Sequence, residues 1–389
     1  MGLYQCIVRE KQMNASQRYA SQTVLDEIGV EGQQRLAQAR VLVVGAGGLG
    51  SPVLLYLTAA GVGQKMHGGR IGIIDDDQVD TSNLQRQILF REKDLGQAKA
   101  MAGAHHLEGL NSSTQIHPIK DRLRIENVLE IFSDYDIIVD GSDNFATKFL
   151  INDAAVKLGL PVVYGSVLGF EGQACIFWAQ HGPCYRCLYP HPPVTHVPNC
   201  AQYGTLGGVA GVIGAIQSVE VCKLALGLVH CEERGLATLI GQLWIADARN
   251  WDTRNLKISK NPMCTVCGIA PKNVCLTQSP SAFCTSHSVA MLDLAALEAM
   301  HQSGHDVLIL DVRALHEWQT KHLPNARLVP LHSLLSDPTV LDSLDPQKTI
   351  VVHCEHGARS ARACQYLIER GFSAFNLIVD WAKIDFSTT

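Results

Sequence analysis

One cysteine near the C-terminal end of this sequence has the surroundings of a reactive thiolate. Cys354 follows the apolar run 349–353, which predicts a buried strand, and a helix is predicted from residue 358 to about residue 370. A tight loop between strand and helix directs backbone N–H groups and the positive end of the helix dipole toward the sulfur. Arg359 adds positive charge. This arrangement favours a thiolate and would stabilise a persulfide anion; a buried structural cysteine is the alternative.

A glycine-rich turn near residue 45 predicts a phosphate-binding site. Its glycines follow the predicted strand 39–44 and precede the predicted helix 51–60, in a G-x-G-x-x-G pattern formed by Gly45, Gly47, Gly48 and Gly50. Glycines permit a tight turn and a close approach of the backbone to a ligand, and the helix N-terminus attracts phosphate. Alone, the pattern is typical of a nicotinamide-dependent dehydrogenase, and a turn without function is the simplest alternative.

Charged residues after this turn favour a nucleoside triphosphate over a dinucleotide. Asp75 and Asp77 end the next predicted strand, where a carboxylate can bind ribose hydroxyls. Arg86 and Lys99 would stabilise the charge that develops on the phosphates when a triphosphate is cleaved. Asp143 offers the hard oxygen ligand that Mg²⁺ prefers. Each cation alone would be interpreted as a solvated surface charge, but the ordered set favours ATP.

Two C-x-x-C pairs far apart in the sequence predict a structural metal site. They are Cys184 with Cys187 and Cys264 with Cys267. Four thiolates in two tight pairs match a closed, tetrahedral Zn²⁺ site. Two redox-active pairs are the alternative, which is disfavoured because neither pair is predicted to open a helix directly after a strand.

Composition fits a globular α/β protein, and the cytoplasm is its expected compartment. The chain has 389 residues, 47% of them hydrophobic and 18% charged, with a net charge of -5 that argues against nucleic acid as a partner. No apolar run reaches the roughly 20 residues of a membrane helix, and no signal peptide is visible at the N-terminus. Thirteen cysteines in a reducing compartment indicate metal binding or thiol chemistry rather than disulfides.

The pattern of elements predicts two α/β domains. Strands alternate with helices up to about residue 228 and predict a parallel, Rossmann-like sheet covered on both faces. The pattern restarts with strands at 307–311 and 349–353 and predicts a small second domain. The expected boundaries are an extension at 1–17, a nucleotide-binding domain at 18–269, a linker at 270–286 and a small domain at 287–389.

The ordered motifs of residues 18–268 resemble the MoeB/ThiF family of ubiquitin-activating-type adenylating enzymes. The most specific part is the string Ser-Asn-Leu-Gln-Arg-Gln at residues 82–87. The resemblance implies a homodimer, a zinc ion on the four cysteines, and binding of Mg²⁺-ATP by the four glycines, Asp75, Asp77, Asn83, Arg86, Gln87, Lys99 and Asp143. In that family a cysteine on the loop over the adenylate matches Cys200, for which a covalent role is expected; a small buried residue is the alternative.

One position departs from this family. The family pattern Arg-Tyr-x-Arg-Gln places its second arginine in the ATP site of the neighbouring subunit, whereas this chain has Ser21 there. Either Arg18 takes over this role or the adenylation site is weakened.

Residues from about 287 onward resemble rhodaneses. The resemblance rests on Asp-Val-Arg at 311–313, Glu-Trp at 317–318, His-Leu-Pro-Asn-Ala at 322–326 and the loop opened by Cys354. Many rhodaneses that use thiosulfate have a basic residue directly after the cysteine, where this chain has Glu355. The resemblance therefore favours a protein persulfide as sulfur donor.

The fused order resembles bifunctional adenylyltransferase/sulfurtransferases of the molybdopterin-synthase type. It implies that the chain adenylates the C-terminal glycine of a ubiquitin-like sulfur carrier of MoaD or ThiS type, ending in Gly-Gly. A Cys354 persulfide, supplied by a cysteine desulfurase, would then give a thiocarboxylate. Molybdenum cofactor, thiamin, cysteine, tRNA thiolation and siderophore pathways all stay open. A rhodanese-active scaffold with a weakened adenylation site and an NAD-dependent oxidoreductase are the rival functions.

Overall fold

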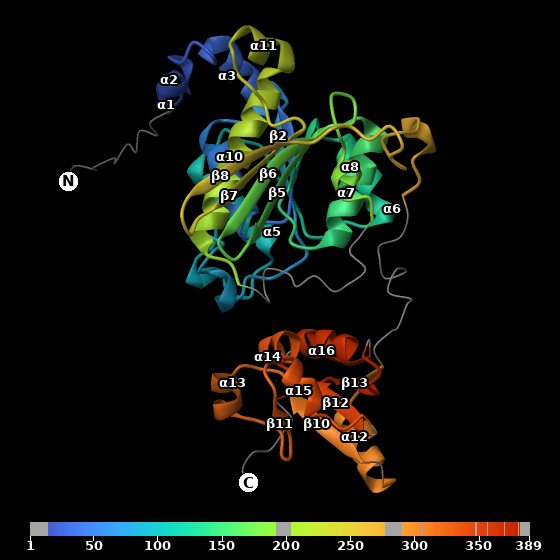
Figure 1. The fold of residues 1–389 in the computed structure, drawn as a ribbon. Helices are drawn as coiled ribbons and strands as arrows, with labels where there is room; N and C mark the ends of the chain where they lie inside the picture. Colours follow the sequence, from blue (N-terminus) through green and yellow to red (C-terminus); the bar gives the residue numbers. More distant parts are fainter. Residues whose placement is uncertain are drawn as a thin grey trace, which may run out of the picture. The chain divides into compact units, whose positions relative to one another are not determined.

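The computed structural model describes residues 15–191, 204–276, 290–304, 306–346, 348–355, 357–368, 370–379 and 381. The chain divides into two compact units, one containing the described residues up to 276 and the other those from 290 onward (Figure 1). The predicted mixture of a Rossmann-like domain and a small α/β domain is confirmed.

The first unit is built on an eight-stranded sheet in the order β3-β2-β1-β4-β5-β6-β7-β8. Its strands are β1 (Arg40–Val44), β2 (Arg70–Ile74), β3 (Ile116–Ile119), β4 (Ile137–Asp140), β5 (Val162–Leu168), β6 (Glu171–Phe177), β7 (Gln242–Asp247) and β8 (Asp252–Lys257). The first five are parallel to one another, as the strand–helix alternation predicts. The last three strands, which the sequence analysis does not predict, add in antiparallel fashion. A tight turn with Gly169 at φ +60° joins β5 directly to β6, which leaves no room for a crossover helix.

Helices cover both faces of this sheet (Figure 1). The helices are α1 (Ala15–Arg18), α2 (Ala20–Thr23), α3 (Gly29–Gln38), α4 (Gly50–Ala59), α5 (Lys99–Leu110), α6 (Ile125–Ser133), α7 (Phe145–Leu158), α8 (Tyr185–Leu188), α10 (Gly207–Leu226) and α11 (Leu228–Glu233). Short 3-10 turns are η1 (Lys65–His67), η2 (Thr81–Asn83), η3 (Glu92–Asp94) and η4 (Pro271–Asn273). Alternate residues of β1 pack on opposite faces, Val41 and Val43 against α3, α4, α5 and α10, and Leu42 and Val44 against α6, α7 and α8. Period-two alternation thus builds two apolar layers from one strand.

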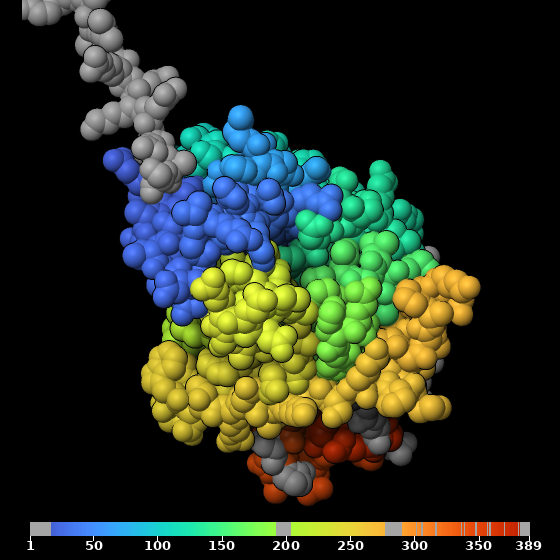
Figure 2. Space-filling view, turned by 90° about the horizontal axis from the view of Figure 1, so that it is seen from above, coloured from blue at the N-terminus to red at the C-terminus, as the bar shows by residue number. Residues whose placement is uncertain are grey.

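Helix α10 is long and apolar enough to cross a membrane, by composition alone. It packs instead as the core helix of the first unit, where Val209, Ile213 and Val221 are buried. Figure 2 shows the N-terminal helices (blue) beside α11 (yellow). There the imidazole of His230 is hydrogen-bonded to the main-chain oxygen of Glu27 at 2.7 Å.

The second unit has a five-stranded parallel sheet in the order β11-β10-β12-β13-β9. Its elements are β9 (Met291–Leu292), α12 (Leu294–Gln302), β10 (Val307–Asp311), α13 (Leu315–Thr320), β11 (Arg327–Leu328), α14 (Leu331–Ser336), α15 (Pro338–Asp342), β12 (Thr349–His353), α16 (Ala358–Ile368) and β13 (Ala374–Leu377). Helices α14 and α16 cover one face and α12 covers the other. Strands β10 and β12 have the bounds predicted from the sequence.

Candidate functional site

The register of three neighbouring strands brings the predicted nucleotide-binding residues to one edge of the sheet. Val44 at the end of β1 is level with Ile74 at the end of β2 and with Asp140 at the end of β4. Connections leave β1 and β4 in opposite directions, which creates a crevice at the carboxyl ends of the strands. This edge is the usual ligand site of an open α/β sheet.

The glycine turn is shaped by close backbone contacts. Gly45 has φ +92°, and its amide donates to the carbonyl of Ile74 at 2.9 Å. A Cβ on Gly50 would lie 1.8 Å from the carbonyl oxygen of Gly45, so only glycine fits at the start of α4. The close approach of the backbone therefore explains why the sequence pattern has a glycine at this position.

Asp75 is bound to the glycine turn and to its own following residues. One carboxylate oxygen accepts from the amide of Ala46 at 2.8 Å, and the other accepts from the amide of Asp77 at 2.9 Å. Asp77 in turn forms an ion pair of 2.9 Å with the largely buried ammonium group of Lys99. Burial raises the pKa of Asp75, while the bond from Ala46 opposes this shift. The turn, the carboxylates and Lys99 thus form one connected cluster.

Arg86 and Gln87 lie against the glycine turn. The aliphatic part of Arg86 lies about 3.5 Å from the position of a Cβ on Gly48, and its guanidinium donates to the main-chain oxygen of Ser82 at 2.8 Å. Gln87 is buried near Gly47. The side-chain oxygen of Asn83 accepts from the amide of Asp80 and so caps η2. Asn83 therefore has a local structural partner that the sequence alone did not indicate.

Asp143 is exposed at the start of α7, next to the same edge. Two residues earlier, Gly141 contacts the glycine turn, since a Cβ on Gly141 would lie 3.0 Å from the carbonyl oxygen of Gly45. Asn144 caps α7 by accepting from the amide of Thr147 at 2.9 Å. An exposed carboxylate beside a phosphate-binding turn can accept a hard cation such as Mg²⁺.

The N-terminal string of the family pattern anchors α1 and α2. The hydroxyl of the buried Tyr19 accepts from Asn111 at 2.8 Å, and Gln22 donates to Gln33 at 2.8 Å. The guanidinium of Arg18 donates to the main-chain oxygen of Leu110 at 3.3 Å. Ser21 is exposed on α2. Ser21 thus lies on the surface of the subunit, where an arginine would be free to extend outward.

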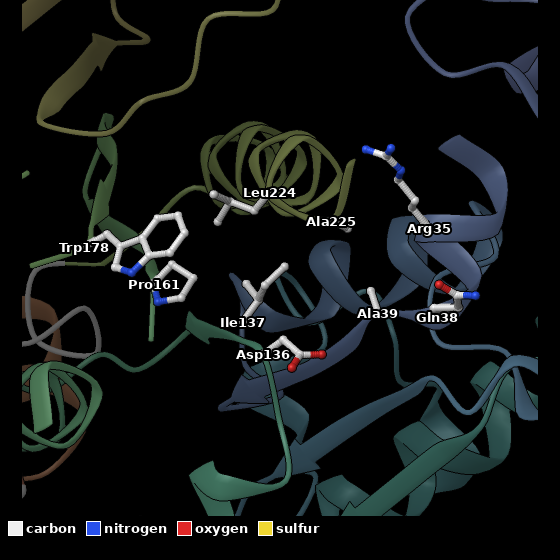
Figure 3. A pocket seen from close by; sticks show the side chains of 9 residues that line it. All are labelled: Arg35, Gln38, Ala39, Asp136, Ile137, Pro161, Trp178, Leu224 and Ala225. Atoms are coloured by element: carbon white, nitrogen blue, oxygen red, sulfur yellow. The ribbon is translucent and has the colours of Figure 1, made fainter. Parts of the chain in front are cut away.

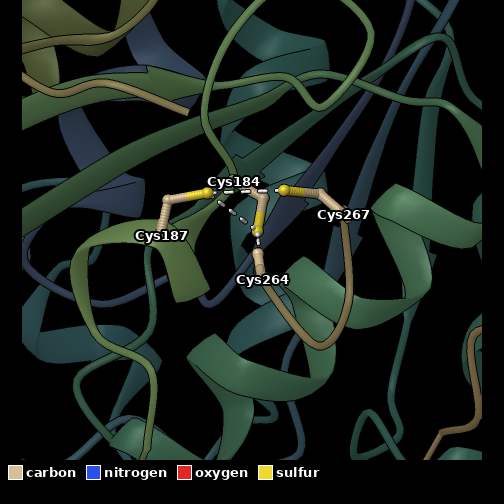
Figure 4. Close-up of side chains that lie close together, drawn as sticks. All are labelled: Cys184, Cys187, Cys264 and Cys267. Carbon is tan, nitrogen blue, oxygen red and sulfur yellow. Dashed lines mark hydrogen bonds between the residues drawn. The ribbon is translucent and has the colours of Figure 1, made fainter. Parts of the chain in front are cut away.

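The four predicted metal-binding cysteines converge (Figure 4). Their sulfurs all lie within 4.8 Å of one another, with separations of 3.9 Å for Cys184–Cys187, 3.6 Å for Cys184–Cys264 and 3.3 Å for Cys187–Cys267. A tetrahedral Zn²⁺ with bonds of about 2.3 Å requires sulfurs about 3.8 Å apart. Burial raises the pKa of Cys267 to about 12, and a bound cation would favour the thiolate form of this residue. The cluster is compatible with zinc.

The segment around the first cysteine pair is fixed to α7. Cys184 is the N-cap of the short helix α8, but residues 178–183 separate it from β6, so this pair does not open a helix directly after a strand. The Tyr185 amide donates to Asn152 at 2.7 Å, and Arg186 forms a bidentate pair of 2.7 Å with Asp153. These contacts make the cysteine cluster part of the rigid core.

In the second unit, Cys354 lies at the junction of β12 and α16. It is only 1% exposed, and its sulfur accepts from the amide and the hydroxyl of Ser360 at 3.4 and 3.3 Å. Gly357 has φ +81° and is held by Asn376, which donates to its carbonyl oxygen at 3.0 Å. Donors directed at the sulfur stabilise a thiolate or persulfide anion, as the strand–loop–helix pattern predicts.

The charged groups around Cys354 are arranged in pairs. Arg359 donates to both carboxylate oxygens of Glu317 at 2.6 Å. Glu355 accepts from the fully buried Arg313 at 3.0 Å and pairs with Lys321 at 3.2 Å. Arg313 and Lys321 also lie over the ring of Trp381, at 4.2 and 4.7 Å from its centre, and Arg313 pairs with Asp311 at 2.7 Å. Each of these three cations therefore already has a carboxylate partner.

The predicted catalytic residue Cys200 lies outside the described residues.

A hollow of about 360 Å³ is found at the amino ends of β1, β4 and β5, opposite the glycine turn. Arg35, Asp136, Trp178 and Leu224 contribute to its lining (Figure 3). Three of its polar side chains already have partners, since Arg35 donates to Leu226, Asp136 pairs with Arg40, and the Trp178 indole donates to Gly159. None of the predicted site residues lines this hollow.

Comparison with known proteins identifies both units. Residues 19–266 match the ThiF family, and residues 293–384 match the rhodanese-like domain. The chain belongs to the ThiF family. The predicted resemblance to adenylating enzymes with a fused rhodanese domain is thereby confirmed, and a nicotinamide-dependent oxidoreductase is disfavoured. The ThiF unit contains the glycine turn and the cysteine cluster, and the rhodanese-like unit contains Cys354.

Two relatives align over 90% or more of this chain, and a third aligns over 65% of it. The chain is 38% identical over 385 residues to a probable adenylyltransferase/sulfurtransferase MoeZ of Mycobacterium tuberculosis, covering 94% of this chain and 92% of the relative. It is 38% identical to an adenylyltransferase and sulfurtransferase MOCS3 of Anopheles gambiae, covering 90% and 81%. A sulfur carrier protein adenylyltransferase of Thermus thermophilus is 44% identical over 65% of this chain and 91% of that relative. The predicted class, adenylyltransferase plus sulfurtransferase, is confirmed.

Solved structures agree on the fold of the ThiF unit. E. coli MccB, crystallised with MccA-N7isoASN, superposes with a TM-score of 0.55 at 21% identity, covering 66% of this chain and 76% of that one. PaaA superposes with a TM-score of 0.51 at 19% identity, covering 67% and 79%. At these identities the similarity concerns the fold alone.

Proposed function

We propose that this chain uses ATP to adenylate the C-terminal glycine of a small ubiquitin-like sulfur carrier ending in Gly-Gly, and then converts it to a thiocarboxylate. The observation that carries the proposal is the coexistence in one chain of a glycine turn at the carboxyl ends of parallel strands and a buried Cys354 whose sulfur accepts two hydrogen bonds from Ser360. The Thermus thermophilus relative, named a sulfur carrier protein adenylyltransferase, supports the choice of substrate.

In the first half-reaction a carboxylate oxygen of the carrier bonds to the α-phosphorus of ATP while the bond to pyrophosphate breaks. The glycine turn and the N-terminus of α4 would hold the phosphates. Arg86 and Lys99 would offset the charge that develops on the leaving pyrophosphate. Lys99 must exchange its present partner, Asp77, for a phosphate oxygen to do so. Mg²⁺ would supply further neutralising charge, with Asp143 as its protein ligand.

In the second half-reaction sulfur replaces AMP on the carrier. The outer sulfur of a Cys354 persulfide attacks the carbonyl carbon of the acyl-adenylate, and AMP leaves with the electrons of the broken C–O bond. The product is an acyl disulfide between carrier and Cys354. A second thiolate then attacks the Cys354 sulfur, which releases the thiocarboxylate and leaves a disulfide for a cellular thiol to reduce. Cys200 is the intramolecular candidate for that second thiol.

The structural metal would be zinc, held by Cys184, Cys187, Cys264 and Cys267. The near-tetrahedral spacing of the sulfurs supports this assignment. A further donor, the amide of Asn261, lies 3.4 Å from the Cys187 sulfur and would orient that thiolate. The metal would join the end of the ThiF unit to its core and take no part in the reaction.

The sulfur donor would be a protein persulfide on a cysteine desulfurase. A small dianion such as thiosulfate needs free cations at the cysteine loop. Here Arg313 and Lys321 pair with Glu355, and Arg359 pairs with Glu317. We also propose that the enzyme is a cytoplasmic homodimer formed through the ThiF unit.

A rhodanese-active scaffold is the second candidate, and the exposed Ser21 favours it. Carrier-dependent exchange of labelled pyrophosphate into ATP separates the two functions. The proposal predicts exchange that requires both the purified chain and a carrier ending in Gly-Gly, and none with a carrier lacking its last glycine. Absence of exchange with MoaD-type and ThiS-type carriers, while thiocarboxylate forms only when another activating enzyme is added, would establish the scaffold instead.

A further inference from the structure

Lys148 is a buried cation that none of these steps uses. Its side chain is 6% exposed on α7, and its ammonium group donates to the carboxylate of Asp140 at 3.0 Å and to the main-chain oxygen of Gly165 at 3.0 Å. The same group lies 4.8 Å from the centre of the Tyr164 ring. Lys148 therefore joins α7 to the end of β4 and to the middle of β5.

Asp140 uses its second carboxylate oxygen to fix the next turn. That oxygen accepts from the amide of Ser142 at 3.0 Å and from its hydroxyl at 2.6 Å. The main-chain oxygen of Asp140 accepts from the buried Gln217 of α10 at 3.0 Å, and Gln217 also donates to Val163 at 3.0 Å. The end of β4 is thus held by side chains of α7 and α10 and by the turn that follows it.

The turn 141–143, fixed in this way, lies next to the glycine turn and contains the proposed Mg²⁺ ligand. The amide of Gly141 donates to the carbonyl of Val44 at 2.9 Å, and the backbones of Gly141 and Gly45 are in direct contact. Asp143 follows within the same turn. A displacement at Asp140 would therefore move the glycine turn and the proposed Mg²⁺ ligand together.

We propose that Lys148 is a positioning residue for ATP binding, acting through Asp140 and the 141–143 turn. The inference rests on the proposed adenylating function of this edge. Without Lys148 the carboxylate of Asp140 would be left buried without its cation, which strongly disfavours the present geometry. The carboxylate would turn toward solvent, and because it holds Ser142, the turn would follow it. A shift of about 1 Å in a binding site can cost roughly 100-fold in activity.

The test compares four single variants of the full-length chain. Lys148→Met removes the charge at similar length, and Lys148→Arg keeps it. Ser142→Ala removes one link to Asp140 without changing the buried charge. Lys157→Met is the matched control, because Lys157 lies on the same helix but donates to the main chain at Val274, away from the nucleotide edge. ATP affinity is measured by calorimetry over a range of Mg²⁺ concentrations, together with KM and kcat for ATP in carrier-dependent exchange.

Lys148→Met should bind ATP roughly 10- to 100-fold more weakly, in line with the cost of a shift of about 1 Å in a binding site. Ser142→Ala should show a smaller loss of affinity. Lys148→Arg should recover most of the affinity, and Lys157→Met should match wild type. Metal content and the sulfurtransferase activity of Cys354 should stay unchanged throughout, which separates positioning from general unfolding. Wild-type ATP affinity in a folded Lys148→Met protein would overturn the proposal.

If Lys148→Met does not fold, Ser142→Ala decides, and wild-type affinity in that variant would overturn the proposal. Calorimetry needs no carrier. If the wild type binds ATP but exchanges no pyrophosphate with any carrier, the adenylating function fails while the role of Lys148 is still measured.

Discussion

Arg359 donates two hydrogen bonds of 2.6 Å to the carboxylate of Glu317, so the cation beside Cys354 is held in place by α13. These bonds are the main reason why the pKa of Glu317 is lowered to about 2, although burial opposes the shift. The guanidinium of Arg359 is therefore held in place before a sulfur donor binds. The contribution of this pair to stability can be followed through the ionisation of Glu317.

This pair predicts a pH-dependent stability of the rhodanese-like unit. The ordinary pKa of a glutamate is 4.5, and it is about 2 in the folded chain, so unfolding at intermediate pH takes up a proton. The pair should stabilise the unit fully above about pH 5, and this contribution should be lost as the pH falls toward 2. Glu317→Gln should lower the unfolding free energy at pH 7 by about 1–2 kcal/mol.

Urea denaturation of wild type and variant at several pH values measures this effect. Glu298→Gln, an exposed position on α12, is the control and should change little. A difference between Glu317→Gln and wild type that is the same at pH 7 and near pH 2 would contradict the assigned pair.

Gly50→Ala should strongly weaken ATP binding. The new Cβ would lie 1.8 Å from the carbonyl oxygen of Gly45, so the turn has to open. Gly109→Ala on α5 is the matched control, because a Cβ there has nothing within 4 Å. Calorimetry with ATP should give at least roughly 100-fold weaker binding for Gly50→Ala, in line with the cost of a shift of about 1 Å, and no loss for Gly109→Ala. Comparable binding by both variants would show that phosphate is bound elsewhere.

Removal of one thiolate should release the structural metal. Cys264→Ser is expected to lower the zinc content and to reduce the Tm of the ThiF unit by roughly 5 °C or more. Cys275→Ser, at an exposed cysteine outside the cluster, should leave both unchanged. Metal analysis and calorimetry measure the outcome, and full zinc content in Cys264→Ser would argue against the four-cysteine site.

Glu355 should control the use of small anionic sulfur donors. Replacing it with glutamine frees Lys321 and one side of Arg313, while Asp311 still pairs with the buried guanidinium. Glu355→Gln should lower the KM for thiosulfate in sulfur transfer to cyanide about 5- to 30-fold, as expected for one or two kcal/mol. The double variant with Lys321→Met should reverse much of the gain. An unchanged KM in Glu355→Gln would mean that these charges do not select the donor.

The sequence predicts those elements whose own residues form a recognisable spacing or apolar run. The strand 349–353, the glycine turn and the two cysteine pairs were read from spacing and apolar runs, and the structure brings each set together. The antiparallel strands β6, β7 and β8 are not predicted. The residues of β8 are all exposed, so that strand carries no alternation of apolar and polar side chains.

Contacts between residues that are far apart in the chain could not be predicted from the sequence either. The partners of Lys148 are Asp140 and Gly165, which belong to two other elements, and a lysine in a helix is ordinarily solvated. Its only local signal is its place beside apolar residues of α7. Pairing of Glu355 with Arg313, at a distance of 42 residues in the chain, depends on the register of β10 with β12.

The central claim is that one chain activates the carrier at the ThiF unit and supplies sulfur from Cys354. The most direct test incubates wild type and Cys354→Ala with ATP, Mg²⁺, a carrier ending in Gly-Gly and a persulfide donor, and follows both pyrophosphate exchange and the intact mass of the carrier. The variant should exchange pyrophosphate at the wild-type rate and form no thiocarboxylate. Thiocarboxylate formation by Cys354→Ala, or loss of exchange in a folded variant, would contradict this division of labour.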